Sequence, residues 1–137
     1  MDLIGPDVFV NASVAPGTPP DQVAQRLLGK PGAKPKSTPW VLQWVEAMLS
    51  KTPSFKQENV KPHMELIRSL VDVVEVNIQE SDWLKGLVAS AKAVGAKRVI
   101  TDHPDLADQV EVEGIQFVST EAWLVEASTP PPPPPKR

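Results

Sequence analysis

Four acidic residues stand where the fold of this chain could bring carboxylates together: Asp7, Glu46, Asp82 and Asp102. Asp7 and Asp102 adjoin short apolar runs that are typical of strands, and Asp82 follows a third such run. Glu46 lies inside an apolar stretch with helical spacing. Ligand sites of open α/β sheets lie beyond the carboxyl ends of the strands, so these four side chains are the first candidates for chemistry.

A divalent metal ion is the partner that such a group of acids suggests. Carboxylates that meet in one cleft repel each other, and Mg²⁺ or Mn²⁺ removes that cost while taking oxygen ligands. The ion can activate water and stabilise the charge that develops in phosphodiester cleavage. The chain has no cysteine and only two histidines, which suits a carboxylate site. We therefore predict Mg or Mn bound by Asp7, Glu46, Asp82 and Asp102.

Each of these acids also has a structural explanation that needs no metal. Asp82 in a first helical turn complements the helix dipole. Asp102, followed by His103 and Pro104, can cap a helix or turn the chain, and Thr101 beside it can contact a phosphate or hold a carboxylate. Glu46 can be an exposed residue at the flank of its helix. Asp7 is the hardest to explain in this way, because a charge against a buried strand is costly unless it is paired.

The elements that would position these acids follow from apolar periodicity and from capping residues. Strands are expected at residues 7–10, 73–78, 98–101 and 115–118. Helices are expected at 21–28, from a Thr38-Pro39 start to Pro53, at 55–70, from a Ser81 cap to Gly95, and from 120. Strands alternating with helices predict a three-layer α/β/α sandwich with a central, mostly parallel sheet.

One domain followed by a tail is the expected organisation. Residues 1–126 are long enough for one sizeable core, and residues 127–137 are predicted to be a disordered proline-rich tail. Its run from Pro130 to Pro135, followed by Lys136 and Arg137, favours a polyproline II rod. The tail acts either as a spacer or as a docking peptide for an aromatic-lined groove.

Composition restricts the partners and the compartment. The formal net charge is -3, from 14 basic and 17 acidic residues, so RNA binding would need a local basic patch or a bridging metal. The absence of cysteine suits a reducing compartment, and no secretory signal or membrane-spanning run is apparent, so we expect a cytoplasmic protein with no membrane contact. Four tryptophans at helical spacings are expected in the core: Trp40, Trp44, Trp83 and Trp123.

The order of elements and acids resembles the PIN-domain family. Residues 91–106 are similar to the family's helix, glycine turn, strand and Thr/Asp-containing loop. Residues 115–124 resemble its closing strand and helix, and residues 7–12 its opening strand. Glu46 falls where the family's helical glutamate is expected. The resemblance spans about residues 3–125.

The resemblance implies a cleft of three or four acids that binds Mg²⁺ or Mn²⁺ for RNA hydrolysis. The chain departs from the family's pattern at the first acid, because an ungapped alignment puts the Asp-x-Asn opening on Gly5, Pro6 and Asp7. The family's third acid would fall on Leu84, two residues from Asp82.

Two readings of function remain open. The first is a metal-dependent ribonuclease that hydrolyses RNA phosphodiester bonds. Many relatives in the family are toxins, which implies an antitoxin-type protein partner and a homodimer. The alternative is a catalytically inactive PIN-like interaction module with a proline-rich docking tail.

Overall fold

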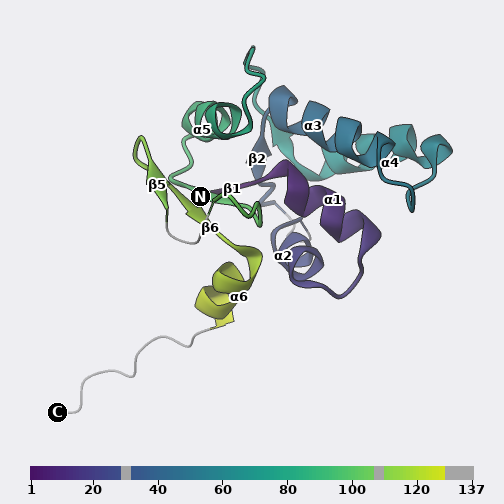
Figure 1. Ribbon diagram of the computed structural model, residues 1–137, viewed down its shortest axis with the longest axis horizontal. Helices are drawn as coiled ribbons and strands as arrows, with labels where there is room; N and C mark the ends of the chain where they lie inside the picture. The colour runs from purple at the N-terminus through teal and green to yellow at the C-terminus, as the bar shows by residue number, and fades with distance from the viewer. Residues whose placement is uncertain (29–31, 107–109, 129–137) are drawn as a thin grey trace.

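The computed structural model describes residues 1–28, 32–106 and 110–128 (Figure 1). Over these ranges the chain is a mixed α/β protein with six helices and a mostly parallel four-stranded sheet. The expected α/β class and the mainly parallel sheet are therefore confirmed. The last helix ends at Ser128, two residues beyond the expected domain boundary, and the proline run lies outside the described residues.

The four-stranded sheet has the order β1-β4-β6-β5. Strands β1 (Asp2–Ile4), β4 (Arg98–Ile100) and β6 (Ile115–Val118) are parallel neighbours, and β5 (Glu111–Val112) is antiparallel to β6. The β5–β6 turn places Glu113 and Gly114 at φ 50° and 81°, the conformation that two-residue hairpin turns favour. Strands β2 (Lys36–Ser37) and β3 (Asp72–Val73) form a separate parallel pair.

The helices of the described residues are α1 (Pro6–Val14), α2 (Pro19–Leu28), α3 (Pro39–Ser50), α4 (Gln57–Leu70), α5 (Trp83–Val94) and α6 (Thr120–Ser128). In Figure 1, α5 and α6 lie at opposite ends of the view with the sheet between them, and α1 to α4 gather beside it. Helix α5 contacts β1, β4 and β6, whereas α6 contacts α2.

Helix α3 begins and α5 ends where the sequence predicts. The Thr38 hydroxyl oxygen accepts a hydrogen bond from the Val41 amide at 3.3 Å, and Pro39 occupies the first turn. Gly95 ends α5 in the left-handed region at φ 75°, which a residue without a side chain adopts at little cost. Asp82 caps α5, so the expectation that Ser81 is the cap was wrong.

The strand predicted at residues 7–10 is instead part of α1, and the first strand is β1. Pro6 fits the first turn of a helix, and the residues after it are buried on every side: Val8, Phe9 and Val10. A short apolar run does not distinguish a strand from a helix that is buried all round, which is why the prediction failed.

The strand predicted at residues 73–78 is paired only at its start. Strand β3 ends at Val73, and the Val74 amide still donates to the Ser37 carbonyl at 2.9 Å. Residues 74–80, which we call the connector, then form no regular element. Its side chains alternate between half-buried (Val74, Val76, Ile78) and exposed (Glu75, Asn77, Gln79), so the period of two reflects packing on one face without a neighbouring strand.

A single hydrophobic core joins the sheet to the helices. Its fully buried members include Leu3, Val99 and Phe117 from the sheet and Val41 and Leu87 from α3 and α5. None of the helices in the described ranges combines the length and the apolar character that are needed to cross a bilayer.

Candidate functional site

Three parallel strands end together at one edge of the sheet, which we call the carboxyl edge. Ile4, Ile100 and Val118 are the last residues of β1, β4 and β6. The segments that follow bring polar side chains from distant parts of the sequence into contact: Asp7, Thr101, Asp102 and Thr120. Sequence reasoning expected chemistry at this edge, and two of the four predicted acids lie here.

Asp7 lies in the first turn of α1 and is 8% exposed. Its Oδ1 accepts a hydrogen bond from the Thr101 hydroxyl at 2.9 Å, and its Oδ2 accepts one from the Asp102 amide at 2.8 Å. Burial raises the pKa of the Asp7 carboxyl above its ordinary value, and the charge of Asp102 raises it further, whereas these two hydrogen bonds lower it. The raised pKa shows that burial outweighs the hydrogen bonds.

The Asp102 carboxylate is exposed but has two internal partners. Its Oδ1 accepts a hydrogen bond from the Thr120 amide at 2.8 Å, and its Oδ2 accepts one from the Thr120 hydroxyl at 2.7 Å. Thr120 is the first residue of α6 and is buried. Asp7 and Asp102 therefore join the beginnings of α1 and α6 to the end of β4.

Gly5 leaves no room for a further acid at this edge. Its amide donates to the Ile100 carbonyl at 2.8 Å. A Cβ at this position would lie 2.8 Å from both Asp7 Oδ1 and the Ile100 carbonyl oxygen. Any side chain here would force these backbone and carboxylate atoms apart, so position 5, to which the resemblance to the PIN family would assign the first acid, has no space for a carboxylate side chain.

Asp82 and Glu46 have separate environments. Asp82 is exposed, and its Oδ2 caps α5 by accepting from the Lys85 amide at 2.9 Å. Glu46 is exposed on α3, where its backbone carbonyl accepts from the Ser50 hydroxyl. Across residues 1–28, 32–106 and 110–128, no three or more His, Cys, Asp or Glu side chains are grouped so that they could hold a metal ion.

Sequence reasoning missed Thr120 as a hydrogen-bond partner and the ring contact of His103. Thr101 was expected to contact a phosphate or to hold a carboxylate, and its hydroxyl does donate to Asp7. Thr120 was predicted only as the start of a helix. A hydroxyl residue within two positions of the end of a strand is the signal that could have indicated it. The His103 ring lies 5.7 Å from the Trp83 ring, and His103 Nδ1 accepts from the Asp105 amide at 3.2 Å.

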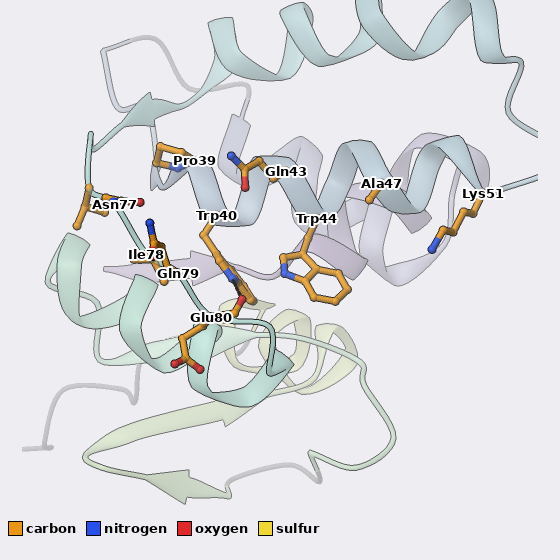
Figure 2. Close-up of a pocket in the computed structure, with 11 residues that line it drawn as sticks. Pro39, Trp40, Gln43, Trp44, Ala47, Lys51, Asn77, Ile78, Gln79 and Glu80 are labelled. Atoms are coloured by element: carbon orange, nitrogen blue, oxygen red, sulfur yellow. Dashed lines mark hydrogen bonds between the residues drawn. The ribbon is translucent and has the colours of Figure 1, made fainter.

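A groove of about 560 Å³ lies between α3 and the connector, and we call it the tryptophan groove (Figure 2). Its wall from α3 consists of Pro39, Trp40, Gln43, Trp44, Ala47 and, just beyond the helix, Lys51, and its other wall is residues 76–80. The Trp40 indole N–H donates to the Glu80 carbonyl at 2.8 Å and holds the connector in place. The prediction that the tryptophans are core residues is right for Trp40, whereas Trp44 is only half-buried.

Tight packing fixes the floor of the tryptophan groove. The rings of Trp40 and Trp44 lie 5.7 Å apart, and those of Trp44 and Trp83 lie 5.1 Å apart, edge to face. A Cβ on Gly86 of α5 would lie 1.9 Å from the Trp40 ring, so the indole occupies the space of a missing side chain. The aromatic surface is therefore rigid.

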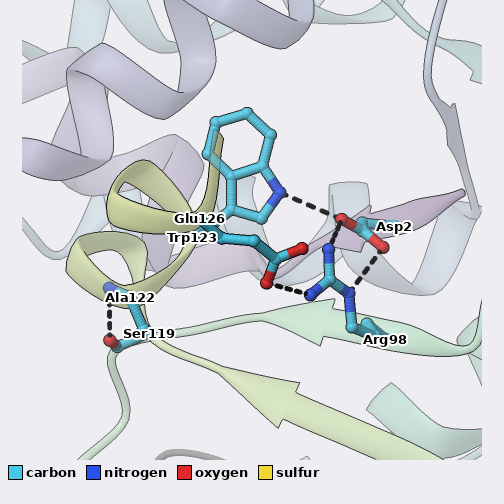
Figure 3. Close-up of polar contacts among 6 residues, drawn as sticks. All are labelled: Asp2, Arg98, Ser119, Ala122, Trp123 and Glu126. Atoms are coloured by element: carbon cyan, nitrogen blue, oxygen red, sulfur yellow. Dashed lines mark hydrogen bonds and ion pairs between the residues drawn. The ribbon is translucent and has the colours of Figure 1, made fainter. Parts of the chain in front are cut away.

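An ion-pair network at the amino ends of the strands ties α6 to the sheet (Figure 3). Arg98 donates to both carboxylate oxygens of Asp2, at 3.1 and 2.9 Å, and to Glu126 at 2.7 Å. The Trp123 indole N–H also donates to Asp2, at 2.9 Å. The bidentate geometry raises the pKa of Arg98 and makes this a structural contact.

A second hollow, of about 390 Å³, lies among α1, α2 and α4 and is mostly apolar. Ser13 Oγ and His63 Nε2 lie 2.7 Å apart at its wall, and the Ser13 hydroxyl also donates to the Phe9 carbonyl at 2.8 Å. Because Ser13 directs its proton to Phe9, the His63 ring is the donor in the shared hydrogen bond. Burial lowers the pKa of His63, which is consistent with a neutral structural histidine.

No protein-family model matches this chain, and no curated protein sequence matches it significantly.

Proposed function

We propose that this domain is a PIN-like interaction module in which the acids at the carboxyl edge have a structural role. The observation that carries this proposal is the set of hydrogen bonds that Asp7 and Asp102 accept. Each of their four carboxylate oxygens has an internal donor between 2.7 and 2.9 Å. The PIN-like description rests on the order of the elements and on the parallel strands β1, β4 and β6.

The geometry of the acids favours this proposal over catalysis. A metal-dependent phosphodiesterase needs carboxylates that converge on one ion and leave positions for water and phosphate. Here Asp7 and Asp102 are adjacent, Asp82 caps α5, and Glu46 is exposed on α3 without a side-chain partner among the described residues. The tryptophan groove supplies the alternative, a rigid aromatic surface that is open to a ligand.

A metal-dependent ribonuclease is the second candidate, and one observation favours it. Asp7 and Asp102 lie together beyond the carboxyl ends of parallel strands, which is where open α/β sheets bind ligands. In that reading Mg or Mn would be bound by Asp7 and Asp102, with Asp82 and Glu46 brought closer by rearrangement. An RNA substrate, an antitoxin-type partner and a homodimer belong to this second candidate alone.

Calorimetric titration with Mn²⁺ and an RNA cleavage assay distinguish the two candidates. The variants are Asp7→Asn and Asp102→Asn, because asparagine lacks the charge but keeps the shape of the side chain. At position 7 its oxygen can accept from the Asp102 amide while its NH₂ group donates to the Thr101 hydroxyl. At position 102 its oxygen can accept from the Thr120 amide while its NH₂ group donates to the Thr120 hydroxyl. The interaction module predicts no saturable Mn²⁺ binding and equal, background cleavage for all three proteins. Saturable binding and cleavage that both substitutions abolish would contradict it.

A further inference from the structure

The tryptophan groove offers hydrogen-bond donors that have no partner among the residues that the structure describes. Trp44 Nε1 and the side-chain amides of Gln43, Asn77 and Gln79 form no hydrogen bonds with other described residues. Figure 2 shows Trp40 and Trp44 extending from one side of α3 and Gln43 on the upper side of the helix in this view. The groove therefore combines flat indole surface with several side-chain N–H donors along its walls.

A polyproline II segment is the ligand whose chemistry matches this surface. Proline has no backbone N–H, so a proline run presents only carbonyl acceptors and apolar rings. Its extended shape is fixed before binding, which reduces the entropy that is lost in a groove. Proline-rich segments dock in aromatic-lined grooves for these reasons.

The chain itself carries such a segment. Six consecutive prolines at 130–135 are followed by Lys136 and Arg137. Glu80 lines the tryptophan groove, so the basic pair has an acidic partner there. Charges at an exposed rim contribute mainly to orientation and to the rate of association.

The position of α6 decides whether the segment reaches its own groove or that of another molecule. Helix α6 ends at Ser128 and packs against α2, at the opposite end of the view in Figure 1 from α3 and α5. Nine residues follow Ser128, and a polyproline II chain advances about 3.1 Å per residue. The segment must pass around the molecule to reach its own groove, whereas a second copy can approach directly.

We propose that residues 130–137 of one copy of this chain bind in the tryptophan groove of a second copy. Trp44 and Gln43 donate to proline carbonyls, the prolines pack on the indole rings, and Lys136 and Arg137 lie near Glu80. This assignment rests on the proposed interaction function and names its ligand. Since each copy has both a groove and a segment, the contact can be reciprocal or can extend to further copies.

Sedimentation velocity of three full-length proteins over a range of concentrations tests the assignment. The first is the unmodified chain, which is expected to self-associate as the concentration rises. The second carries Trp44→Phe and Gln43→Ala, which remove both donors while position 44 keeps an aromatic ring, and it is expected to associate at least tenfold more weakly. The third carries Pro131→Gly, Pro132→Gly and Pro134→Gly, which remove the preformed extended shape and are expected to weaken association similarly.

Mixing the two variants gives the sharpest result. The second protein, the groove variant, keeps an intact proline segment, and the third, the segment variant, keeps an intact groove. The mixture is therefore expected to form a heterodimer at concentrations at which each variant alone is monomeric. Glu46→Ala is the matched control, because Glu46 lies on α3 but does not line the groove. The control should associate as the unmodified chain does.

Three outcomes would overturn the assignment. They are a chain that stays monomeric at every concentration, association that the proline substitutions leave unchanged, and a mixture that forms no heterodimer. If the segment variant with its three glycines associated as strongly as the unmodified chain, the contact would not depend on a proline helix, and the connector would instead pair with an extended strand of the other copy. None of these outcomes affects the metal and RNA experiments. The proline segment can therefore prove to be the wrong ligand while the interaction function stands. RNA cleavage would refute the interaction function without deciding whether the proline segment binds the groove.

Discussion

The carboxyl edge and the tryptophan groove differ in how far their polar groups are satisfied within the protein. At the carboxyl edge, Asp7 and Asp102 accept four hydrogen bonds. The donors are the Thr101 hydroxyl, the Asp102 amide, and both the amide and the hydroxyl of Thr120. In the groove, the indole N–H of Trp44 has no acceptor in the described part of the chain. Polar groups with internal partners stabilise the fold, whereas groups that lack them remain available to a ligand.

The positions of acidic residues in the sequence indicate function less specifically than the hydrogen-bond partners of their carboxylates do. Four carboxylates near the ends of expected strands suggested a metal centre, yet the structure gives Asp82 a helix-capping role and leaves Glu46 exposed. The tryptophans were predicted to be core residues rather than stacking platforms, yet Trp44 lies at the wall of an open groove. The contrast between the two regions leads to predictions that separate packing, hydrogen bonding and capping.

The largest effect is expected from Gly86→Ala. In an open helical position this change stabilises a helix by about 1 kcal/mol, because alanine has the higher helix propensity. Here the added Cβ would lie 1.9 Å from the ring of Trp40, which is 4% exposed, so we expect a loss of about 3 kcal/mol in the free energy of unfolding. Urea unfolding measures it, and a stabilised variant would show that the groove floor is loosely packed.

Asp7→Ala is expected to have the next largest effect at the carboxyl edge. It leaves the partly buried Asp102 amide and the buried Thr101 hydroxyl without their acceptor, which costs about 2 kcal/mol in the free energy of unfolding. Asp7→Asn keeps an acceptor and is expected to cost less than about 1 kcal/mol. Equal losses for the two variants in urea unfolding would mean that these hydrogen bonds are not what makes Asp7 important.

The pH dependence of stability should also report on Asp7. Its pKa in the folded state is raised above its ordinary value of 3.8, so between the two values the folded protein binds more protons than the unfolded chain. The contribution of Asp7 to the free energy of unfolding therefore falls as the pH rises through this window. Subtracting the pH profile of Asp7→Asn from that of the unmodified chain isolates this contribution, and a difference that rises with pH would contradict the burial argument.

The smallest effects separate Asp82 from Glu46. Asp82→Ala removes the cap of α5 and is expected to cost about 1 kcal/mol in the free energy of unfolding. Glu46→Ala changes an exposed side chain and is expected to stay within about 0.5 kcal/mol of the unmodified chain. Thermal unfolding measures both variants. An equal loss in the free energy of unfolding for Asp82→Ala and Glu46→Ala would indicate that the two acids share a site.

The sequence predicts local signals better than it predicts pairing. Thr38 with Pro39, and Gly95, mark helix ends because their effects are local. The strands at 98–100 and 115–118 were also found, since most residues of both runs are buried and β-branched or aromatic. Residues 7–10 and 74–78 were misassigned because burial all round the first part of α1, residues 6–10, and one-sided packing of the connector depend on the tertiary fold.

The site shows the same limit. The sequence led us to the carboxyl edge, and Asp7 and Asp102 do meet there across about 95 residues of chain. The sequence suggests that Thr101 can hold a carboxylate, but it does not reveal that this carboxylate belongs to Asp7 or that Thr120 binds Asp102, because hydrogen-bond partners follow from the register of β1, β4 and β6. The groove escaped prediction because one of its walls is an extended segment without a regular element.

Titration of the uniformly ¹⁵N-labelled full-length chain with Mn²⁺, followed by amide NMR spectra, tests the structural role of the acids most directly. Mn²⁺ broadens the signals of amides near its binding site. If Asp7 and Asp102 serve the fold, signals from residues 5–8, 101–103 and 119–121 should broaden no more than those of other exposed segments. Selective and saturable broadening of those signals would show a metal centre at the carboxyl edge and would contradict this account.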